Sequence, residues 1–326
     1  MATTKTDKQA RRREERLARE RDARAAERRR RLWAYAGGAV LLVVLVALGA
    51  VLLVTGSGTD EEPSVADAPP AAGAPSSGAA SGGHVHGLGV APAGDGVLIA
   101  THNGLYRAAG DGSAPVQVSA EQQDFMGFAV ASRDRLLASG HPAEGQDLPG
   151  VVGLIESRDG GRTWQPVSLL GEADFHVLRA ADERVYGFDG VGGRFLASGD
   201  GGRSWEEREV PAPMFDLAIA PDDPERLIAA TEDGLFTSSD AGRSWRPAGD
   251  AIGLVAWAPS GRLFVVDAQA QVLGGAPGDR LSRRGALPEL PVTFMAAEDA
   301  LYAALADGSV LRSADDGASW TAIAQA

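Results

Sequence analysis

Five histidines are the residues of this chain whose type and spacing are most typical of a binding site. They are His84, His86, His102, His141 and His176, so all of them fall between residues 84 and 176 of a 326-residue chain. The chain has no cysteine, which excludes disulfides, thiolate nucleophiles, iron–sulfur clusters and cysteine-based zinc sites. Imidazole combined with thioether favours copper, whereas imidazole combined with carboxylate suits zinc, nickel or iron.

Three methionines and two aspartates complete the set of candidate residues. Met126, Met214 and Met295 are the methionines beyond the initiator, Asp174 lies two residues before His176, and Asp216 lies two residues after Met214. Asp174 and Asp216 are the candidate catalytic carboxylates if the protein hydrolyses glycosides. The set that we predict to bind a metal, with copper favoured, or another ligand comprises His84, His86, His102, Met126, His141, His176 and Asp216.

An internal repeat predicts how the chain brings these distant residues together. The motif Ser-x-Asp-x-Gly-x-Ser/Thr-Trp occurs four times, and its copies begin 41, 40 and 75 residues apart, so the longest interval is expected to hold a degenerate copy. An aspartate that accepts backbone N–H groups, a glycine with positive φ and a tryptophan that packs between neighbours are typical of a hairpin turn. The recurring residues are Ser157, Asp159, Gly161, Trp164, Ser198, Asp200, Gly202, Trp205, Ser238, Asp240, Gly242, Trp245, Ser313, Asp315, Gly317 and Trp320.

A period near 40 residues with four short strands per unit predicts an all-β, six-bladed β-propeller over residues 84–326. A seventh blade would need more residues than this segment has. The first strands of the six blades are expected at 86–90, 126–130, 176–180, 215–220, 254–258 and 294–297. The second strands are expected at 97–101, 135–139, 184–188, 226–230, 262–266 and 300–304.

The propeller topology places the candidate residues at one mouth of the central channel. The first strand of each blade lines the channel, and its start shares a face of the disc with the end of the second strand, opposite the repeated turns. The segment 141–150 is the longest connection expected at this mouth, and it is either a binding loop or a plain surface insertion. The alternatives to a metal site are the polar lining of a water-filled channel, with methionine as filler, or a site for a small organic ligand or glycan.

The repeated motif is similar to the Asp-box, and residues 84–326 resemble the BNR/Asp-box propeller family. That family includes sialidases, sortilin-type receptor domains and photosystem assembly factors, and the resemblance implies that the serines, aspartates, glycines and tryptophans of the motif are structural. The pattern His84-Val-His86-Gly-Leu, followed by Ala-Thr-His102 and Gly-His141-Pro, is also similar to a bacterial group of exported Asp-box proteins. Members of this group are commonly described as glycosyl hydrolases by similarity.

The residues of a sialidase active site cannot be carried over to this sequence. Sialidases need an arginine triad, a Tyr–Glu nucleophile pair and an acidic aspartate. Here no arginine stands at the start of a first strand, and Tyr106, Tyr186 and Tyr302 fall inside other strands. We therefore expect a binding or assembly module for an extracytoplasmic protein, metal or glycan. The alternative is a sialidase-like glycoside hydrolase that uses mouth carboxylates, so whether the protein is an enzyme stays open.

The N-terminal segments predict a membrane anchor. Residues 33–54 carry no charge and no proline, and the segment is long enough to cross a bilayer as one helix. The basic tail, 1–32, is expected in the cytoplasm by the positive-inside rule, which makes 33–54 a single-pass transmembrane signal anchor. Residues 55–83 are expected to form a flexible Ala/Gly/Pro/Ser linker, which leaves the propeller extracytoplasmic. Residues 32–326 hold 18 basic and 38 acidic residues, which argues against nucleic-acid binding.

Overall fold

The structure, a computed structural model, describes residues 84–91, 94, 96–118, 121–298 and 300–326. The predicted tail, membrane anchor and linker lie outside these described residues. Every described residue belongs to one compact unit. Among the described residues, no helix has the length and apolar character needed to cross a membrane.

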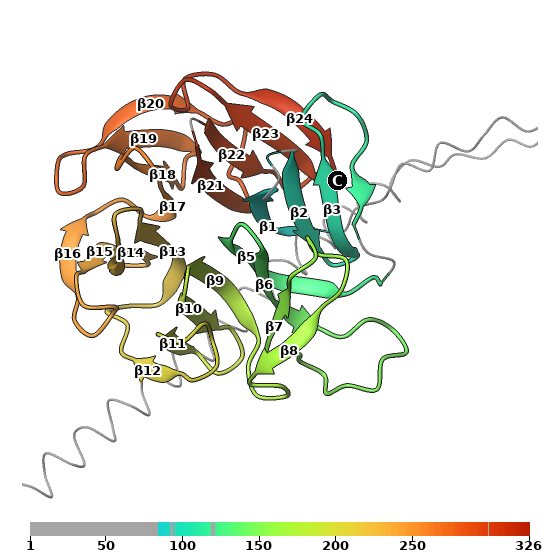
Figure 1. The fold of residues 1–326 in the computed structure, drawn as a ribbon. Helices are drawn as coiled ribbons and strands as arrows, with labels where there is room; N and C mark the ends of the chain where they lie inside the picture. Colours follow the sequence, from blue (N-terminus) through green and yellow to red (C-terminus); the bar gives the residue numbers. More distant parts are fainter. Residues whose placement is uncertain (1–83, 92–93, 95, 119–120, 299) are drawn as a thin grey trace, which may run out of the picture. The chain divides into compact units, whose positions relative to one another are not determined.

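Six four-stranded antiparallel sheets, each built from four consecutive strands, follow one another around a central channel (Figure 1). This arrangement confirms the predicted all-β, six-bladed propeller. The innermost strands are β1 (Val85–Val90), β5 (Asp124–Ser132), β9 (Phe175–Ala181), β13 (Met214–Ala220), β17 (Gly253–Trp257) and β21 (Thr293–Ala297). The second strands are β2 (Val97–Thr101), β6 (Arg135–His141), β10 (Arg184–Asp189), β14 (Asp223–Thr231), β18 (Leu263–Asp267) and β22 (Ala300–Ala304).

The outer half of each blade is formed by a third and a fourth strand. The third strands are β3 (Gly104–Ala108), β7 (Leu154–Ser157), β11 (Arg194–Ser198), β15 (Gly234–Ser238), β19 (Gln271–Gly275) and β23 (Ser309–Ser313). The fourth strands are β4 (Val116–Gln117), β8 (Gln165–Ser168), β12 (Glu206–Arg208), β16 (Arg246–Gly249), β20 (Ser282–Ala286) and β24 (Thr321–Gln325). We call the end of the disc where the innermost strands begin the mouth end, and the end with the repeated turns the turn end.

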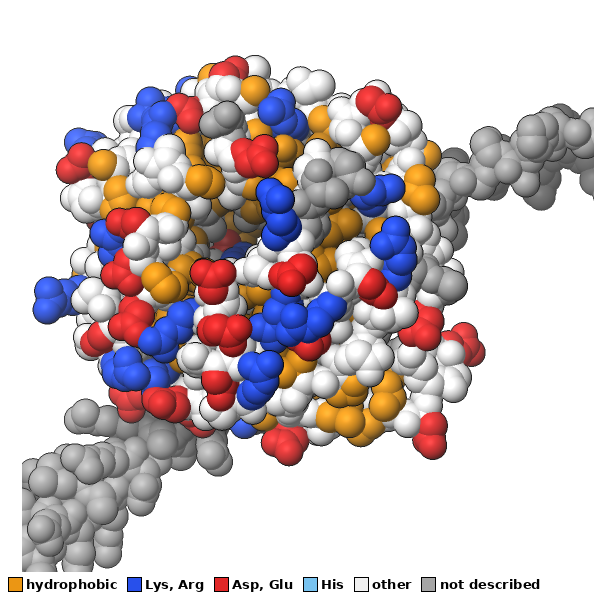
Figure 2. Space-filling view, in the orientation of Figure 1, with side chains coloured by type: hydrophobic (Ala, Val, Ile, Leu, Met, Phe, Trp, Pro, Cys, Tyr) orange, Lys and Arg blue, Asp and Glu red, His pale blue; other side chains and the backbone are white. Residues whose placement is uncertain are grey.

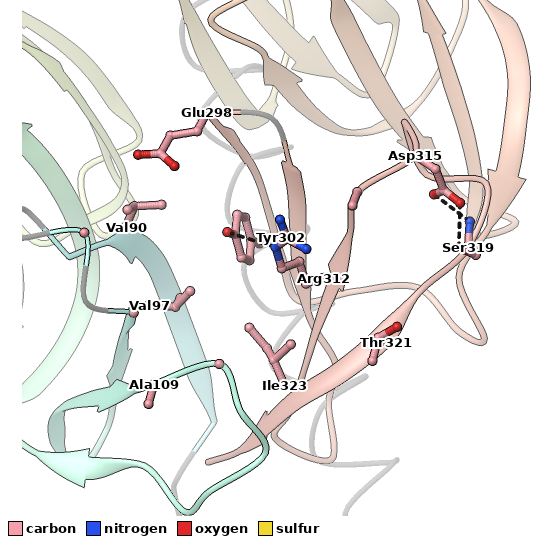
Figure 3. A pocket seen from close by; sticks show the side chains of 14 residues that line it. Val90, Val97, Ala109, Glu298, Tyr302, Arg312, Asp315, Ser319, Thr321 and Ile323 are labelled. Carbon is pink, nitrogen blue, oxygen red and sulfur yellow. Dashed lines mark hydrogen bonds between the residues drawn. The ribbon is translucent and has the colours of Figure 1, made fainter.

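The ring closes by side-chain packing between the last blade and the first, because neither sheet borrows a strand from the other. Val85, Leu88 and Ile99 of the first blade share one apolar cluster with Val310 and Ile323 of the last. At the rim of this seam lies a cavity of about 510 Å³, into which Tyr302 and Arg312 project (Figure 3). Closure of the propeller therefore depends on burial of apolar surface at this seam.

The four repeated turns share one hydrogen-bond pattern. In the second copy, the Ser198 hydroxyl donates to Asp200 Oδ1 at 2.8 Å and accepts from Gly202 N at 2.8 Å. Asp200 Oδ1 also accepts from Ser204 N at 2.9 Å, and Oδ2 accepts from the Ser204 hydroxyl at 2.5 Å. Gly202 has φ of +86°, where a Cβ would meet Leu154 at 2.1 Å. Both carboxylate oxygens are thus used to hold the turn.

The tryptophan that ends each repeated turn packs against the preceding blade. Trp164 and Trp205 lie with their ring centroids 5.0 Å from those of Phe125 and Phe175 of their own blades, and Trp205 Nε1 donates to the Ser168 hydroxyl of the preceding blade at 2.9 Å. Trp205 also joins the apolar cluster that contains Leu137 and Leu196. The turn end is therefore built to hold neighbouring blades together.

Candidate functional site

A β-bulge at the start of the innermost strand sets the side chains at the mouth end in four consecutive blades. In each case the pairing with the second strand skips one residue: Val85 and Gly87, for example, pair with the adjacent residues Thr101 and Ala100. Such an extra residue re-aims its side chain and commonly occurs beside functional sites. The bulged residues are His86, Met126, His176 and Phe215. The innermost strands of the last two blades pair without this shift.

The histidines at the mouth end form a hydrogen-bonded network with two aspartates. His86 Nε2 lies 2.9 Å from His102 Nε2, and His102 Nδ1 lies 2.7 Å from Asp124 Oδ1. The other oxygen, Asp124 Oδ2, lies 3.1 Å from His141 Nδ1. Asp124, at the first position of β5, therefore joins the first blade to the second.

The network continues into the third blade through Asp174. Asp174 Oδ2 lies 2.9 Å from His176 Nε2 and 3.9 Å from His141 Nε2. His84 stands beside the network, with its ring centroid 5.9 Å from that of His102. Five imidazoles and two carboxylates from three blades thus lie around one side of the channel mouth.

Asp124 fixes the orientation of two imidazole rings. A carboxylate accepts hydrogen bonds, so Nδ1 of both His102 and His141 carries the proton. In the neutral ring Nε2 then keeps its lone pair and is able to accept a hydrogen bond or bind a metal. Hydrogen bonding of Nδ1 to a carboxylate is the usual way in which proteins orient a metal-binding histidine.

Two histidines of the network have pKa values shifted in opposite directions. Burial, together with the smaller effect of the neighbouring His102, lowers the pKa of His86 to about 4. The hydrogen bond to Asp174 raises the pKa of His176, against the effect of its burial. His86 is therefore neutral, the form that binds metals, over the whole physiological pH range, whereas His176 is protonated more readily than a free histidine.

Asp174 is the most deeply buried carboxylate of the network. Its side chain is 3% exposed, and its Oδ1 atom has no hydrogen-bond partner among the described residues. Gly190 leaves the space that the neighbouring imidazole occupies, because a Cβ there would meet the His176 ring at 2.8 Å. A buried carboxylate oxygen without a donor is costly unless a cation or an N–H group satisfies it.

The structure distributes the other predicted residues among different roles. Met126 is the bulged residue of β5, half-buried at the mouth end, whereas Met214 is buried in the core between the third and fourth blades. Met295 packs beside the cluster that closes the ring. The 142–153 connection does lie at the mouth end, directly after His141.

Asp216 does not belong to the histidine network. Its carboxylate accepts hydrogen bonds from the Arg179 guanidinium, from Leu217 N at 2.8 Å and from Val255 N at 3.0 Å. These contacts link the innermost strands of the third, fourth and fifth blades. The candidate catalytic pair is thus divided, because Asp174 bonds to a histidine and Asp216 is held in a structural ion pair.

Asp124 and Phe215 are the residues of the mouth end that the sequence did not single out. Asp124 precedes the expected start of its strand at residue 126, so nothing marked it as a neighbour of His102 and His141. Phe215 is 47% exposed although it is a large apolar residue. The signal available in the sequence was its alignment with His86 and His176 at the same position of their blades.

The network as it stands is a set of hydrogen bonds and not a closed coordination shell. No group of three or more histidine, aspartate or glutamate side chains among the described residues is arranged to hold a metal ion. The His86 Nε2 atom, from β1, and the His102 Nε2 atom, from the turn after β2, do lie within hydrogen-bond distance of each other. The chemistry that the geometry supports is binding, by neutral imidazole, thioether and carboxylate groups, of a cation or an N–H donor.

Comparison with known proteins assigns this chain to no family. No protein-family model and no curated protein matches the sequence. Among solved structures, YCF48 bound to D1 peptide has a TM-score of 0.43 and 20% identity, over 60% of this chain and 67% of that chain. YCF48 from Cyanidioschyzon merolae has a TM-score of 0.46 and 12% identity, over 74% of this chain and 85% of that one.

A second group of similar structures consists of GH74 enzymes. The GH74 xyloglucanase from Xanthomonas campestris has a TM-score of 0.48 and 20% identity over 74% of this chain. The match spans 45% of that enzyme's length, so most of the enzyme has no counterpart here. The neighbours thus include YCF48 and GH74 enzymes, and at this degree of likeness no activity of theirs transfers to the chain.

Proposed function

We propose that this protein is a membrane-anchored, extracytoplasmic binding module that holds a transition-metal ion, copper in preference to others, at the mouth end of its propeller. The observation that carries the proposal is the shared β-bulge, which turns His86, Met126 and His176 of three consecutive blades toward the channel mouth. Two imidazoles and a thioether, without thiolate, are a ligand set suited to copper.

The network supplies what such a site needs beyond its ligands. Asp124 orients His102 and His141 through their Nδ1 atoms, as carboxylates commonly do for metal-binding histidines. His86 needs no deprotonation near neutral pH because its pKa is already low. Binding would replace the hydrogen bond between the His86 and His102 Nε2 atoms by bonds to the ion.

The anchor belongs to the same proposal on different grounds. The apolar span 33–54 with its basic flank supports a single-pass topology with an extracytoplasmic propeller. Protease added to spheroplasts should remove the propeller and leave the anchor. Propeller found soluble in the cytoplasm would contradict this part of the proposal without touching the metal site.

We do not propose glycoside hydrolysis. A pair of acid and base carboxylates must face one substrate bond, but Asp216 is held by Arg179 and by two backbone N–H groups. A hydrolase should release product from sialosides or aryl glycosides and lose activity on Asp174→Asn. The purified chain is expected to release none.

Metal retention tests the proposal directly. The purified full-length chain is dialysed against copper, then against buffer, and its metal content is measured by elemental analysis. We expect the wild type to retain a stoichiometric amount, and His86→Ala combined with His176→Ala to retain none while keeping its melting temperature.

Two methionine variants form a matched pair for the same measurement. Met126→Leu removes a thioether from a bulge, whereas Met295→Leu removes one from the innermost strand of a blade without a bulge. Copper retention should weaken in the first and stay unchanged in the second. Equal retention by both, or by wild type and the double histidine variant, would show that the mouth end does not bind the metal.

A further inference from the structure

The connections at the mouth end differ in charge from those at the turn end, because they contain acidic residues and no arginine. These connections hold eleven acidic residues and no arginine. The connections at the turn end include seven arginines, at positions 133, 158, 162, 203, 243, 262 and 280, among their acidic residues. The acidic residues of the mouth-end connections are Glu121, Glu144, Asp147, Glu172, Asp174, Glu209, Glu232, Asp233, Asp250, Glu289 and Asp307.

The visible face in Figure 2 shows the opposite pattern. Arginine side chains and carboxylates are interspersed over it, and no histidine is seen there. The ion pairs at the turn end include Arg262 with Asp316 and Arg203 with Glu183. An anionic partner would therefore be repelled by the mouth end more strongly than by the turn end, and a cationic partner would be attracted to the mouth end.

Exposed apolar side chains gather at the same end as the acidic connections that hold no arginine. Of the eight large hydrophobic side chains that are exposed in the described residues, seven lie in mouth-end connections or at the bulge of β13. The exception, Val116, lies on the outer strand β4. The seven are Leu148, Leu170, Val191, Phe215, Ile252, Leu290 and Val292. Exposed apolar side chains gathered at one face are typical of an interaction surface.

One buried atom at this end also lacks a donor. Asp174 Oδ1 is inside the mouth and has no hydrogen-bond partner among the described residues. A carboxylate oxygen in that position accepts from an ammonium, guanidinium or amide group that enters the mouth. The acidic charge, the exposed apolar side chains and this acceptor all favour a partner that is basic and partly apolar.

We propose that the mouth end docks a polypeptide segment of a partner protein that carries both basic and apolar side chains. Its lysine or arginine groups meet the acidic connections, and its apolar groups cover Phe215, Ile252 and the neighbouring residues. Long-range attraction of this kind mainly raises the association rate and falls with salt. An anionic membrane surface is disfavoured as the occupant, because anionic lipids attract basic and not acidic surfaces.

This inference goes beyond the metal proposal and uses other residues. The connections that carry charge and apolar groups are not the ligands proposed for copper, apart from the proximity of Asp174. Either proposal can fail alone, and copper retention measured on the docking variants separates the two failures.

A synthetic amphipathic peptide of lysine and leucine is the probe, and the same peptide with glutamate in place of lysine is its charge-reversed control. Binding to the purified full-length chain is followed by fluorescence anisotropy at low and at physiological salt. We expect the lysine peptide to bind with an affinity that falls with salt, and the glutamate peptide to show no binding. Absence of lysine-peptide binding, or equal binding of both, would overturn the proposal.

Matched charge variants locate the surface. Glu144→Gln, Asp147→Asn, Glu172→Gln and Asp250→Asn together remove four exposed charges from the mouth end. Asp182→Asn, Asp279→Asn and Glu298→Gln at the turn end, with Glu207→Gln on the outer strand β12, remove four exposed charges away from the mouth-end connections. At low salt the first set should weaken lysine-peptide binding by at least about tenfold, and the second by less than about twofold. Equal losses would mean that only overall charge matters, which contradicts a docking surface.

Apolar contact and the membrane alternative are tested separately. Phe215→Ser should weaken binding of the lysine peptide even at high salt, whereas Val116→Ser, at the exposed apolar side chain away from the mouth, should not. Vesicles of phosphatidylglycerol added to the same chain test the competing occupant. Vesicle binding that the mouth-end charge variants change, with no binding of the lysine peptide, would replace the polypeptide by a lipid surface and end the proposal.

Discussion

The aspartates at the two ends of the propeller differ in their hydrogen-bond partners, although both groups lie beside strand ends. At the turn end, Asp240 and its equivalents accept hydrogen bonds with both oxygens from serine or threonine hydroxyl groups and backbone N–H groups of their own turn. At the mouth end, Asp124 divides its oxygens between two blades, and Asp174 leaves one oxygen without a donor. A carboxylate whose hydrogen bonds are satisfied within its own turn is structural, whereas one that orients histidines from neighbouring strands is available for binding.

The largest effect that would test this contrast is loss of a turn-end tryptophan. Trp205→Ala should destabilise the propeller by about 3 kcal/mol, because the ring fills space between two blades and leaves a cavity when removed. Thermal unfolding measures the loss. Copper retention by the fraction that stays folded should be unchanged. A variant with the wild-type melting temperature and lost copper would reverse the assignment of the two ends.

Acid unfolding should report the turn-end aspartates. The Ser244 and Ser319 hydroxyl groups lower the pKa of Asp240 and of Asp315 to about 2. A depressed carboxyl pKa stabilises the fold above the unfolded value near 4, and that stability is lost as the pH falls through the folded pKa. Melting temperatures between pH 7 and pH 2 should fall steeply below about pH 4.

The double variant Asp240→Asn with Asp315→Asn shows whether those two turns cause the fall in melting temperature below about pH 4. It should be less stable than wild type at pH 7 and should lose less on acidification. Asp279→Asn, an exposed aspartate at the same end, serves as the control and should leave the profile unchanged. If the melting temperature of the double variant falls as steeply below pH 4 as that of wild type, these two aspartates are not the cause of the acid sensitivity.

A smaller effect is expected from Gly190→Ala. The added Cβ would meet the His176 ring at 2.8 Å, so the imidazole must move from its place beside Asp174. Copper retention should decrease, and the melting temperature should change little because Gly190 lies in a surface connection. Gly150→Ala, in a connection at the same end where a Cβ meets nothing within 4 Å, is the control. Retention unchanged in both variants would remove His176 from the site.

The smallest effect concerns the pH dependence of stability without metal. The pKa of His86 is lowered, and the titratable groups that face this ring are His84, His102, Asp124 and His176. Protonation of the folded state is therefore unfavourable, and stability is lost as the pH falls below the unfolded pKa of about 6.5. His176, facing Asp174, Asp189 and Asp124, has a raised pKa, so its stabilisation is present below that value and lost as the pH rises.

Substitution of each histidine should therefore have opposite pH trends. The free energy of unfolding of His86→Gln, relative to wild type, should be more favourable at pH 5 than at pH 8. For His176→Gln, the free energy of unfolding relative to wild type should be less favourable at pH 5 than at pH 8. Chemical unfolding in metal-free buffer at the two pH values measures both. The same trend in both variants would contradict the different surroundings of the two rings.

Much of the fold could be predicted because each blade repeats its signals. The period near 40 residues gave the number of blades, and the expected start of β2 at residue 97 and of β22 at residue 300 agree with the structure. The same periodicity placed the histidines at strand ends. Local patterns of this kind are repeated within every blade, so errors in one unit are corrected by its neighbours.

The contacts within the site could not be predicted in the same way. Whether Asp216 or Asp124 joins the histidines depends on Arg179 and Val255, which lie in other blades and bind Asp216. The bulges that turn His86 and His176 toward the mouth depend on strand pairing, which periodicity does not encode. Tertiary partners, and not residue type, decided which carboxylate was structural.

The most direct test of the account is the X-ray absorption spectrum of the copper-loaded full-length chain. We expect imidazole nitrogen scatterers near 2 Å, the usual length of a metal–imidazole bond, with a sulfur contribution that disappears in Met126→Leu and persists in Met295→Leu. The nitrogen signal should be lost in His86→Ala combined with His176→Ala. Copper bound only through oxygen, or a spectrum that none of these substitutions changes, would contradict a metal site at the mouth end.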